Sequence, residues 1–396
     1  MPVLRPKPGE VLKLPFNPKG SQGSGSSGFQ FVSFPKSPQM VYKIQAGKAT
    51  IYQVLDEAQD KWALKVFHAA FRKPAVLDSN ALLQKLLGKP GLDAATRIVF
   101  TSQDEIVGEY KELEYGVLMP WIIGQTCFDM YMANAKSPTK FSREEALGKA
   151  RDVVTVISGL EREGYVHTDV SSGNLIIPTG SVPRQPSASS TRYGTQLIDL
   201  EDIWFKGRGV PDKPHYTPGY GHPSLQCGAT AACPAGDRYA TIVLVAEILM
   251  LSEPELASKF TPEGYFQADI TDAEARDRYE RAQERLKRIY PAFSDALADA
   301  WKSKTLNECS EIGLLLPTLV PSTVRHRIFD DFVESDPDDS SNQEPPILTI
   351  FEDEKRKQAP PPPPPLPAPT FVEQLMKAFQ SLANTLKGLF KSIFGK

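Results

Sequence analysis

Three polar side chains lie close together in one short stretch of the sequence: His167, Asp169 and Asn174. A carboxylate five residues before a carboxamide can accept the proton of an attacking hydroxyl group while the amide oxygen holds a magnesium ion. These are two tasks that phosphoryl transfer requires. The same residues also suit an ordinary loop in which the Asp caps a turn and the Asn completes it, so the surrounding elements have to distinguish the two interpretations.

The elements beside this stretch predict a loop between a helix and a strand. Apolar residues recur at helical spacing from Glu144 to Arg162. Ser142 and Glu145 form the capping-box pattern that starts a helix. The apolar run Leu175 to Ile177 follows the polar residues and predicts a short strand.

The loop resembles the catalytic loop of protein kinases, H-R-D-L-x-x-x-N. Further motifs follow the order of that family: Ala63-Leu-Lys65 on an expected strand, Asp199-Leu-Glu201 at the end of another, Thr217 to Pro223 within a segment similar to G-T-P-x-Y-x-A-P-E, and Asp237 before an apolar helix. The chain thus resembles a divergent bacterial-type serine/threonine protein kinase. The resemblance implies an α+β, bilobal protein-kinase-like fold over residues 39–321, with a small antiparallel β lobe (39–119) and a larger helical lobe (122–321).

The resemblance also implies ATP- and magnesium-dependent transfer of phosphate to Ser/Thr hydroxyls of a protein substrate, in a signalling role. Asp169 would position and deprotonate the acceptor hydroxyl, Lys65 would anchor the ATP phosphates, and Asn174 with Asp199 would hold Mg²⁺. Other residues expected at the nucleotide are Gly47 in the turn Gln45–Ala49, Ala63 beside Lys65, and Met119 with Trp121 at the hinge between the lobes. Trp121 is either an apolar edge for adenine or part of the core.

Several positions depart from the family pattern. The expected helix Ala75–Leu87 contains no Glu to pair with Lys65, which leaves Asp78 as a candidate. Ser171 stands where serine/threonine kinases place a phosphate-binding Lys. Thr168 replaces the Arg that would bind a phosphorylated activation segment, so switching by such phosphorylation is not expected. Glu201 replaces a Gly, which removes a flexible pivot and adds a carboxylate for a second metal ion.

These departures keep two alternatives open. One is a pseudokinase scaffold that binds nucleotide or partners without catalysis. The other is a small-molecule kinase of the aminoglycoside or choline type, which tolerates a residue other than Lys at Ser171. The segment Thr217 to Pro223 counts against the second alternative, because in the family it forms a platform for a peptide.

Composition narrows the class of protein. The 396 residues are 41% hydrophobic and 23% charged, typical of a globular protein, and the net charge of −3 gives no reason to expect nucleic acid as a partner. The four cysteines contain no C-x-x-C pair, so neither a zinc site nor disulfides are expected. With no signal peptide and no long apolar run, the sequence predicts a cytoplasmic protein.

The two ends differ in composition from the rest of the chain. Residues 1–38 are rich in Gly, Ser and Pro and predict a flexible leader. Residues 322–370 form an acidic and polyproline linker, whose run Pro360–Pro367 is a spacer or a ligand for a polyproline-binding partner. Residues 371–396 predict an amphipathic basic helix. Its apolar stripe within Phe371–Phe394 would bind a membrane surface at the periphery, a partner's groove or the kinase-like domain itself.

Overall fold

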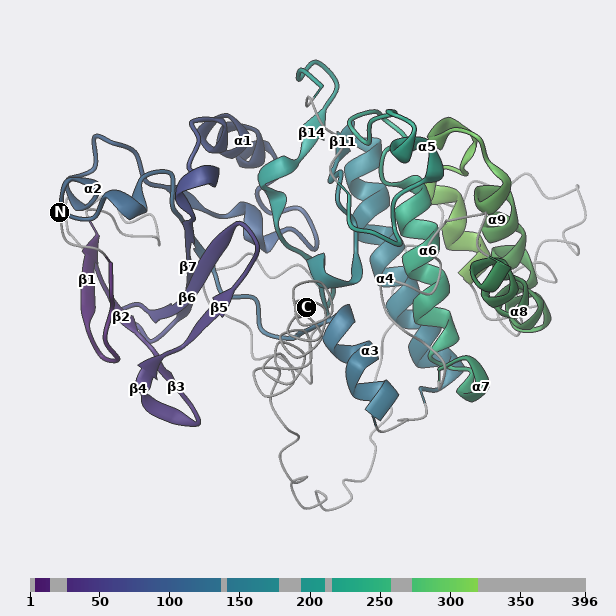
Figure 1. Ribbon diagram of the computed structural model, residues 1–396, viewed down its shortest axis with the longest axis horizontal. Helices are drawn as coiled ribbons and strands as arrows, with labels where there is room; N and C mark the ends of the chain where they lie inside the picture. Colours follow the sequence, from purple (N-terminus) through teal and green to yellow (C-terminus); the bar gives the residue numbers. More distant parts are fainter. Residues whose placement is uncertain are drawn as a thin grey trace, which may run out of the picture. The chain divides into compact units, whose positions relative to one another are not determined.

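The computed structural model describes residues 4–14, 27–136, 141–177, 194–210, 216–257 and 273–319. Within these residues the protein is a mixed α+β fold, in which an antiparallel, curled sheet is accompanied by a set of helices (Figure 1). The predicted linker 322–370, its polyproline run and the predicted helix 371–396 lie outside the described residues.

The strands are short, as their sequences indicate. They are β1 (Val11–Leu14), β2 (Ser27–Phe31), β3 (Ser33–Phe34), β4 (Ser37–Val41), β5 (Lys43–Gln45), β6 (Ala49–Leu55), β7 (Lys61–Phe67), β8 (Ile98–Val99), β9 (Val117–Pro120), β10 (Gln125–Thr126), β11 (Tyr165–Val166), β12 (Leu175–Ile177), β13 (Gln196–Leu197) and β14 (Trp204–Phe205).

The helices are concentrated in the second half of the described chain. They are α1 (Ala75–Leu83), α2 (Glu105–Glu109), α3 (Cys127–Lys136), α4 (Arg143–Arg162), α5 (Pro223–Gln226), α6 (Arg238–Met250), α7 (Pro254–Ala257), α8 (Ala273–Ile289) and α9 (Pro291–Lys302). Among the described residues, no helix combines the length and the apolar character that crossing a membrane requires.

The main sheet positions Lys65. Its strands follow the order β1-β2-β6-β7-β9-β8, with β5 also paired to β6, and every neighbouring pair is antiparallel. On β7, Trp62, Leu64 and Val66 belong to one hydrophobic core, whereas Ala63 belongs to the other. Because side chains alternate along a strand, Lys65 lies on the same face as Ala63.

The prediction of a flexible leader over residues 1–38 is wrong for the parts that form β1, β2, β3 and the start of β4. Val11–Leu14 and Ser27–Phe31 form the paired strands β1 and β2, and β2 continues the sheet onto β6. Leu14 and Phe29 are fully buried, and Phe29 packs edge-on against Trp62 with ring centroids 6.1 Å apart. Alternating apolar residues therefore override the Gly/Ser-rich composition, because each second side chain enters the core.

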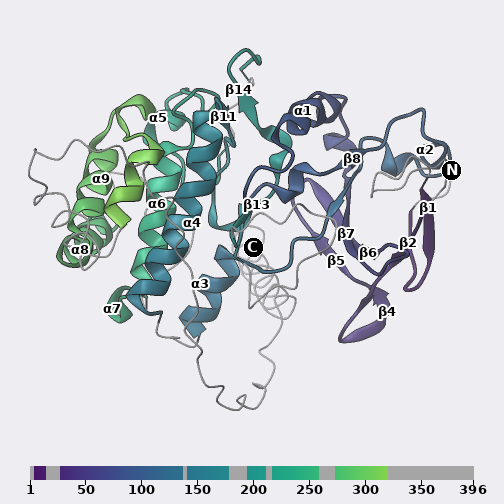
Figure 2. The same ribbon diagram turned by 180° about the vertical axis from the view of Figure 1, so that it is seen from behind.

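Helices α4 and α6 run side by side and support the polar loop (Figures 1 and 2). The capping box of α4 is present: the Ser142 side chain accepts from the Glu145 backbone N–H at 3.1 Å, and the Glu145 carboxylate accepts from the Ser142 N–H at 2.8 Å. Helix α6 is apolar except for Arg238, Thr241 and Glu247, and its residues Tyr239–Met250 are all buried.

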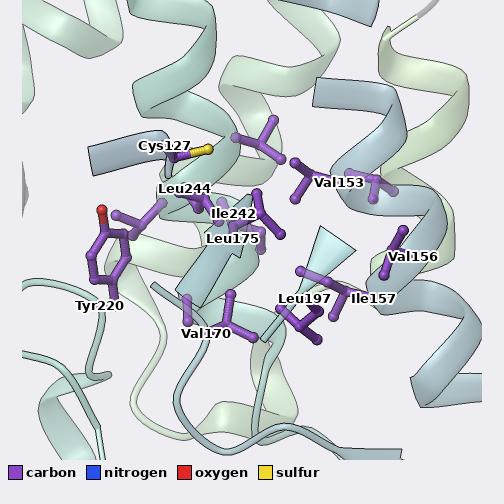
Figure 3. Packing of buried hydrophobic residues seen from close by; sticks show 14 of the residues in the cluster. Cys127, Val153, Val156, Ile157, Val170, Leu175, Leu197, Tyr220, Ile242 and Leu244 are labelled. Atoms are coloured by element: carbon purple, nitrogen blue, oxygen red, sulfur yellow. The ribbon is translucent and has the colours of Figure 1, made fainter. Parts of the chain in front are cut away.

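The loop that carries Asp169 rests on this helical core. Val170 and Leu175 are buried on either side of the loop, and Leu197 is buried on the neighbouring strand β13. Figure 3 shows these side chains with Val153 of α4 and Ile242 of α6 in one packed cluster. Such close packing leaves the loop backbone little room to move, so its polar side chains are held in fixed directions.

Candidate active site

Asp169 and Asn174 lie together, as the sequence predicts. Asp169 follows β11, and Asn174 ends the 3₁₀ turn Ser172–Asn174 that leads into β12. The Asn174 Nδ2 donates to the backbone oxygen of Asp169 at 2.9 Å and to its Oδ2 at 3.3 Å. The Asn174 amide thus fixes one edge of the Asp169 carboxylate.

The second oxygen of Asp169 is held by a residue from a distant segment. Thr217 Oγ1 donates to Asp169 Oδ1 at 2.8 Å. Asp169 is half-buried, so its carboxylate is reached from solvent as well as from these two donors. Each oxygen therefore has one defined donor, which sets the orientation of the group.

Asp237 anchors the backbone of the loop. Its carboxylate accepts from the N–H groups of His167 and Thr168 at 2.6 and 2.9 Å. Burial raises the pKa of Asp237 to about 6, although these two bonds and His167 oppose the rise. Thr168 has a φ of 70°, a left-handed conformation that is uncommon for a β-branched residue. The bonds to Asp237 stabilise this strained turn immediately before Asp169.

Lys65 lies between two carboxylates. Its Nζ is 2.5 Å from Asp199 Oδ1 and 2.9 Å from Glu201 Oε2. Glu201 Oε1 in turn is 2.7 Å from Nη1 of Arg97. Asp199 has a φ of 61°, and this left-handed residue turns the chain so that both carboxylates meet Lys65. Lys65 and Asp199, two residues predicted for the site, are thus in direct contact.

The charges in this cluster stabilise one another. Burial alone would lower the pKa of Lys65, but the charges of Glu201 and Asp199 outweigh it and raise the pKa. Burial would raise the pKa of Glu201, yet Lys65 and Arg97 hold it well below its usual range. Burial and the Glu201 carboxylate raise the pKa of Asp199 against the opposing charge of Lys65. Lys65 and Glu201 are therefore charged at neutral pH.

Asp78 does not pair with Lys65. Its side chain on α1 is exposed, and Glu201 occupies the position beside the ammonium group. Asp78, the candidate to replace the missing helix Glu, therefore does not make that contact. Glu201 was also expected to offer a carboxylate to a second metal ion. In the structure each of its carboxylate oxygens is already in an ion pair, one with Lys65 and one with Arg97.

Two polar residues that sequence reasoning missed attach this cluster to the rest of the fold. Ser79 on α1 donates from its Oγ to the backbone oxygen of Glu201 at 2.6 Å. Arg208 donates from Nη2 to Ser79 Oγ at 3.1 Å. A third is Arg97, which immediately precedes β8. Its sequence neighbours give no signal for a role, because only the fold buries its guanidinium beside Glu201.

The turn between β5 and β6 lies near the same cluster. Ala46 N–H donates to Ala49 O at 2.9 Å and closes the turn. Lys48 Nζ is 2.8 Å from Asp202 Oδ2, so the turn is tied to the segment that follows Glu201. Gly47 is exposed, and a Cβ atom there would meet nothing within 4 Å. The fold therefore does not itself require a glycine at this position.

The predicted hinge residues lie on or next to β9. Met119 pairs with Ala63 across the sheet, and both are buried. Trp121 donates its backbone N–H to Lys61 O at 3.0 Å, and its indole packs edge-on against Tyr42 at 5.6 Å. Of the two roles expected for Trp121, packing in the sheet is the one that these contacts provide.

Asp199 and Asn174 are the two predicted site residues that could supply oxygen ligands to Mg²⁺. The two residues are close, because Ile198 N–H, just before Asp199, donates to Asn174 O at 3.0 Å. The Asp199 side chain keeps 38% of its surface exposed. Among the described residues, no group of three His, Cys, Asp or Glu side chains is arranged to hold a metal ion by itself. A carboxylate and an amide oxygen do fit Mg²⁺ that takes its remaining ligands from phosphate and water.

The fold therefore brings four features to one region: the Asp169 carboxylate, which the Thr217 hydroxyl orients, the buried Lys65, and the side-chain oxygens of Asn174 and Asp199. Gly47 lies on a turn tied to this region, and Ala63 shares its strand face with Lys65. No model of a known protein family matches the chain, and no curated protein is significantly similar to it in sequence.

Proposed function

We propose that this protein transfers the terminal phosphoryl group of ATP to Ser or Thr hydroxyls of protein substrates, with Mg²⁺ as cofactor and in a signalling role. The observation that carries the proposal is the Asp169 carboxylate, oriented by Thr217 at 2.8 Å and by Asn174 at 3.3 Å. The proposal includes the finer fold expectation, a kinase-like arrangement with a small lobe over 39–119 and a larger lobe over 122–321.

In the proposed reaction Asp169 acts on the acceptor. A carboxylate whose oxygens already have donors presents a defined direction to an incoming hydroxyl group and can accept its proton as the phosphoryl group is transferred. Its orientation does not depend on the substrate, because Thr217 and Asn174 belong to the protein. Orientation of this kind lowers the entropy cost of reaching the reactive geometry.

The nucleotide would be bound by the residues of the sheet. Lys65 anchors the α- and β-phosphates, Gly47 allows close approach of the turn, and Ala63 with Met119 provides an apolar wall for the base. Asp199 and Asn174 would hold Mg²⁺, which neutralises phosphate charge when bound. Because the N–H of Trp121 is already donated to Lys61 O, the base would use other backbone groups of the hinge.

A protein substrate is favoured by the segment after Thr217. Tyr220 is buried and donates from its hydroxyl to Glu247 Oε2 at 2.5 Å, which fastens the segment to α6. Gly221 is close to Tyr216, since a Cβ atom at Gly221 would lie 2.3 Å from the Tyr216 ring. A segment fixed at these points offers an ordered surface next to Asp169, where a peptide can bind.

A pseudokinase scaffold that binds nucleotide without catalysis is the second candidate. The observation that favours it is Ser171, which is buried with 2% of its surface exposed and stands where a phosphate-binding Lys is usual. Without that cation, stabilisation of charge on the transferred phosphoryl group depends on Lys65 and on the metal ion.

Transfer of radiolabelled phosphate from ATP tests the proposal. The wild-type protein and Asp169→Asn are incubated with Mg²⁺–ATP and with a mixture of proteins, peptides, aminoglycosides and choline. We expect labelled Ser or Thr with the wild type, a loss of about 100-fold or more with Asp169→Asn, and equal ATP affinity for both. Equal labelling by both proteins would refute the role of Asp169. ATP binding without any transfer would favour the scaffold, and a labelled small molecule would favour a small-molecule kinase.

A further inference from the structure

Glu201 bridges two buried cations. Its Oε2 is 2.9 Å from Lys65 Nζ, and its Oε1 is 2.7 Å from Arg97 Nη1. The side chains of Lys65, Glu201 and Arg97 expose 7%, 10% and 1% of their surfaces. Since both oxygens are in ion pairs, rotation of the carboxylate would break one of them. The buried charges thus fix Glu201 in one orientation.

We propose that Glu201 holds Lys65 in its phosphate-binding position, and that Arg97 is a positioning residue that acts through Glu201. The inference rests on the proposed function, because binding of phosphate is the task assigned to Lys65. Glu201 thereby takes the place of a carboxylate on α1, whose Asp78 is exposed.

Arg97 is itself held from a second side. Its Nε donates to Ala94 O at 2.7 Å, so the guanidinium cannot turn freely toward another partner. A buried guanidinium with a fixed Nε presents Nη1 in one direction, and that direction is occupied by Glu201. We therefore infer that Arg97 determines the position of the Glu201 carboxylate, and that Glu201 does not determine the position of Arg97.

Helix α1 contributes to the cluster through a side-chain hydroxyl group instead of through a charge. Ser79 donates to the backbone oxygen of Glu201 at 2.6 Å. The partner of Lys65 and the metal-binding Asp199 belong to one three-residue stretch, 199–201. The Lys65 anchor and the metal ligand are consequently positioned together, and no charged group on α1 has to move toward Lys65.

The contacts also indicate what the loss of Glu201 would change. Lys65 would keep Asp199 as its carboxylate partner at 2.5 Å. With Asp199 as its only carboxylate partner, the Lys65 ammonium group would move toward Asp199 and away from the phosphates. It would also compete with Mg²⁺ for the Asp199 carboxylate. Substitution of Glu201 should therefore weaken the use of ATP more than it weakens the binding of the acceptor.

The test compares four variants in steady-state phosphoryl transfer and in calorimetric binding of Mg²⁺–ATP. They are Glu201→Gln, Arg97→Met, the double variant of both, and the control Asp78→Asn on α1. We expect Glu201→Gln to raise the KM for ATP about tenfold, since a charge-assisted hydrogen bond is lost, and to leave the KM for the acceptor unchanged. Asp78→Asn should change both constants by less than about twofold, as surface substitutions usually do.

The double variant separates positioning from a structural role. If Arg97 acts through Glu201, Arg97→Met raises the KM for ATP in the wild-type background but changes it by less than about twofold in the Glu201→Gln background. The double variant also removes the unpaired buried cation that Glu201→Gln leaves behind, so it keeps a fold in which the effect on KM is measured. A merely structural Arg97 would give additive changes in KM together with a lower unfolding temperature.

The outcomes distinguish this inference from the proposed function. An active wild-type protein whose KM for ATP is unchanged by Glu201→Gln, or is raised by Asp78→Asn, overturns the inference and leaves the proposed function intact. A wild-type protein that neither binds ATP nor transfers phosphate overturns the proposed function and this inference with it. A tenfold rise in KM confined to Glu201→Gln, Arg97→Met and the double variant supports the inference.

Discussion

Thr217 and Asp169 are separated by 48 positions in the sequence, yet the Thr217 hydroxyl donates to the Asp169 carboxylate at 2.8 Å. The bond connects the segment 216–225 directly to the loop 165–174. Because the segment is fastened to α6 through Tyr220 and Glu247, the orientation of Asp169 depends on two distant parts of the fold. The direction of this carboxylate thus depends on the tertiary structure as well as on Asn174 of the local loop.

Removal of the Thr217 hydroxyl should slow phosphoryl transfer. We expect Thr217→Ala to lower kcat about tenfold or more, because a hydrogen bond to a charged group contributes about 1.5–3 kcal/mol. Thr217→Ser keeps the hydroxyl and should retain most of the activity. The KM for ATP should stay constant in both variants. Steady-state kinetics check the prediction, and wild-type kcat in Thr217→Ala would show that Asn174 alone orients the carboxylate.

Gly47 provides a test of nucleotide binding that does not disturb the fold. A Cβ atom there meets nothing within 4 Å, so Gly47→Ala should leave the unfolding temperature unchanged. If the turn approaches the ATP phosphates, the added methyl group should raise the KM for ATP several-fold. Gly148→Ala is the matched control, because Gly148 on α4 also has free space around it. This control should gain up to about 1 kcal/mol of helix stability with unchanged kinetics.

The pH dependence of stability should reveal Asp237. Its folded pKa of about 6 lies above its ordinary value of 3.8, because burial favours the neutral form. The stabilisation from this group is complete below pH 3.8 and is lost as the pH rises through 6. The difference of about two units corresponds to about 3 kcal/mol.

The measurement compares the wild type with Asp237→Asn, which does not titrate. The free energy of unfolding of the wild type minus that of the variant should decrease by about 3 kcal/mol between pH 3 and pH 7. Chemical denaturation at several pH values provides both numbers. A difference that grows with pH would mean that the bonds from His167 and Thr168, which favour the ionised carboxylate, outweigh burial.

The first strands should contribute to the stability of the fold. Leu14 on β1 is fully buried, so Leu14→Ala should cost about 2–5 kcal/mol of unfolding free energy. Val11→Ala on the same strand is the control, because Val11 is 52% exposed and its truncation should cost less than about 0.5 kcal/mol. Denaturant titration of both variants checks the prediction. Equal stability of Leu14→Ala and wild type would mean that β1 is detached in solution.

Much of the local structure was predictable from the sequence. The spacing of Asp169 and Asn174, the capping box at Ser142 and the direction of Lys65 each depend on residues a few positions apart. Local spacing fixes such features through helix and strand geometry. The strands β1 and β2 were not predicted, because the Gly/Ser-rich composition of the leader conceals the alternation of Phe29 and Phe31.

The partner of Lys65 was not predictable in the same way. The sequence predicted Asp78 on a helix as the candidate partner and assigned Glu201, after a strand, to a second metal ion; nothing local indicates that Glu201 pairs with Lys65. The choice is made by Arg97, a buried cation that lies 104 positions from Glu201. Contacts of this kind form only when separate elements pack, so they are absent from any local pattern.

Lys65, Arg97, Asp199 and Glu201 place two cations and two carboxylates in one cluster, whose charges balance. A balanced cluster exerts little long-range attraction on a polyanion. Encounter of ATP with this part of the protein should therefore depend weakly on ionic strength, in contrast to sites that steer phosphate with an excess of positive charge. The association rate of ATP with this site would then depend on the cations bound to the nucleotide and not on an electrostatic field of the protein surface.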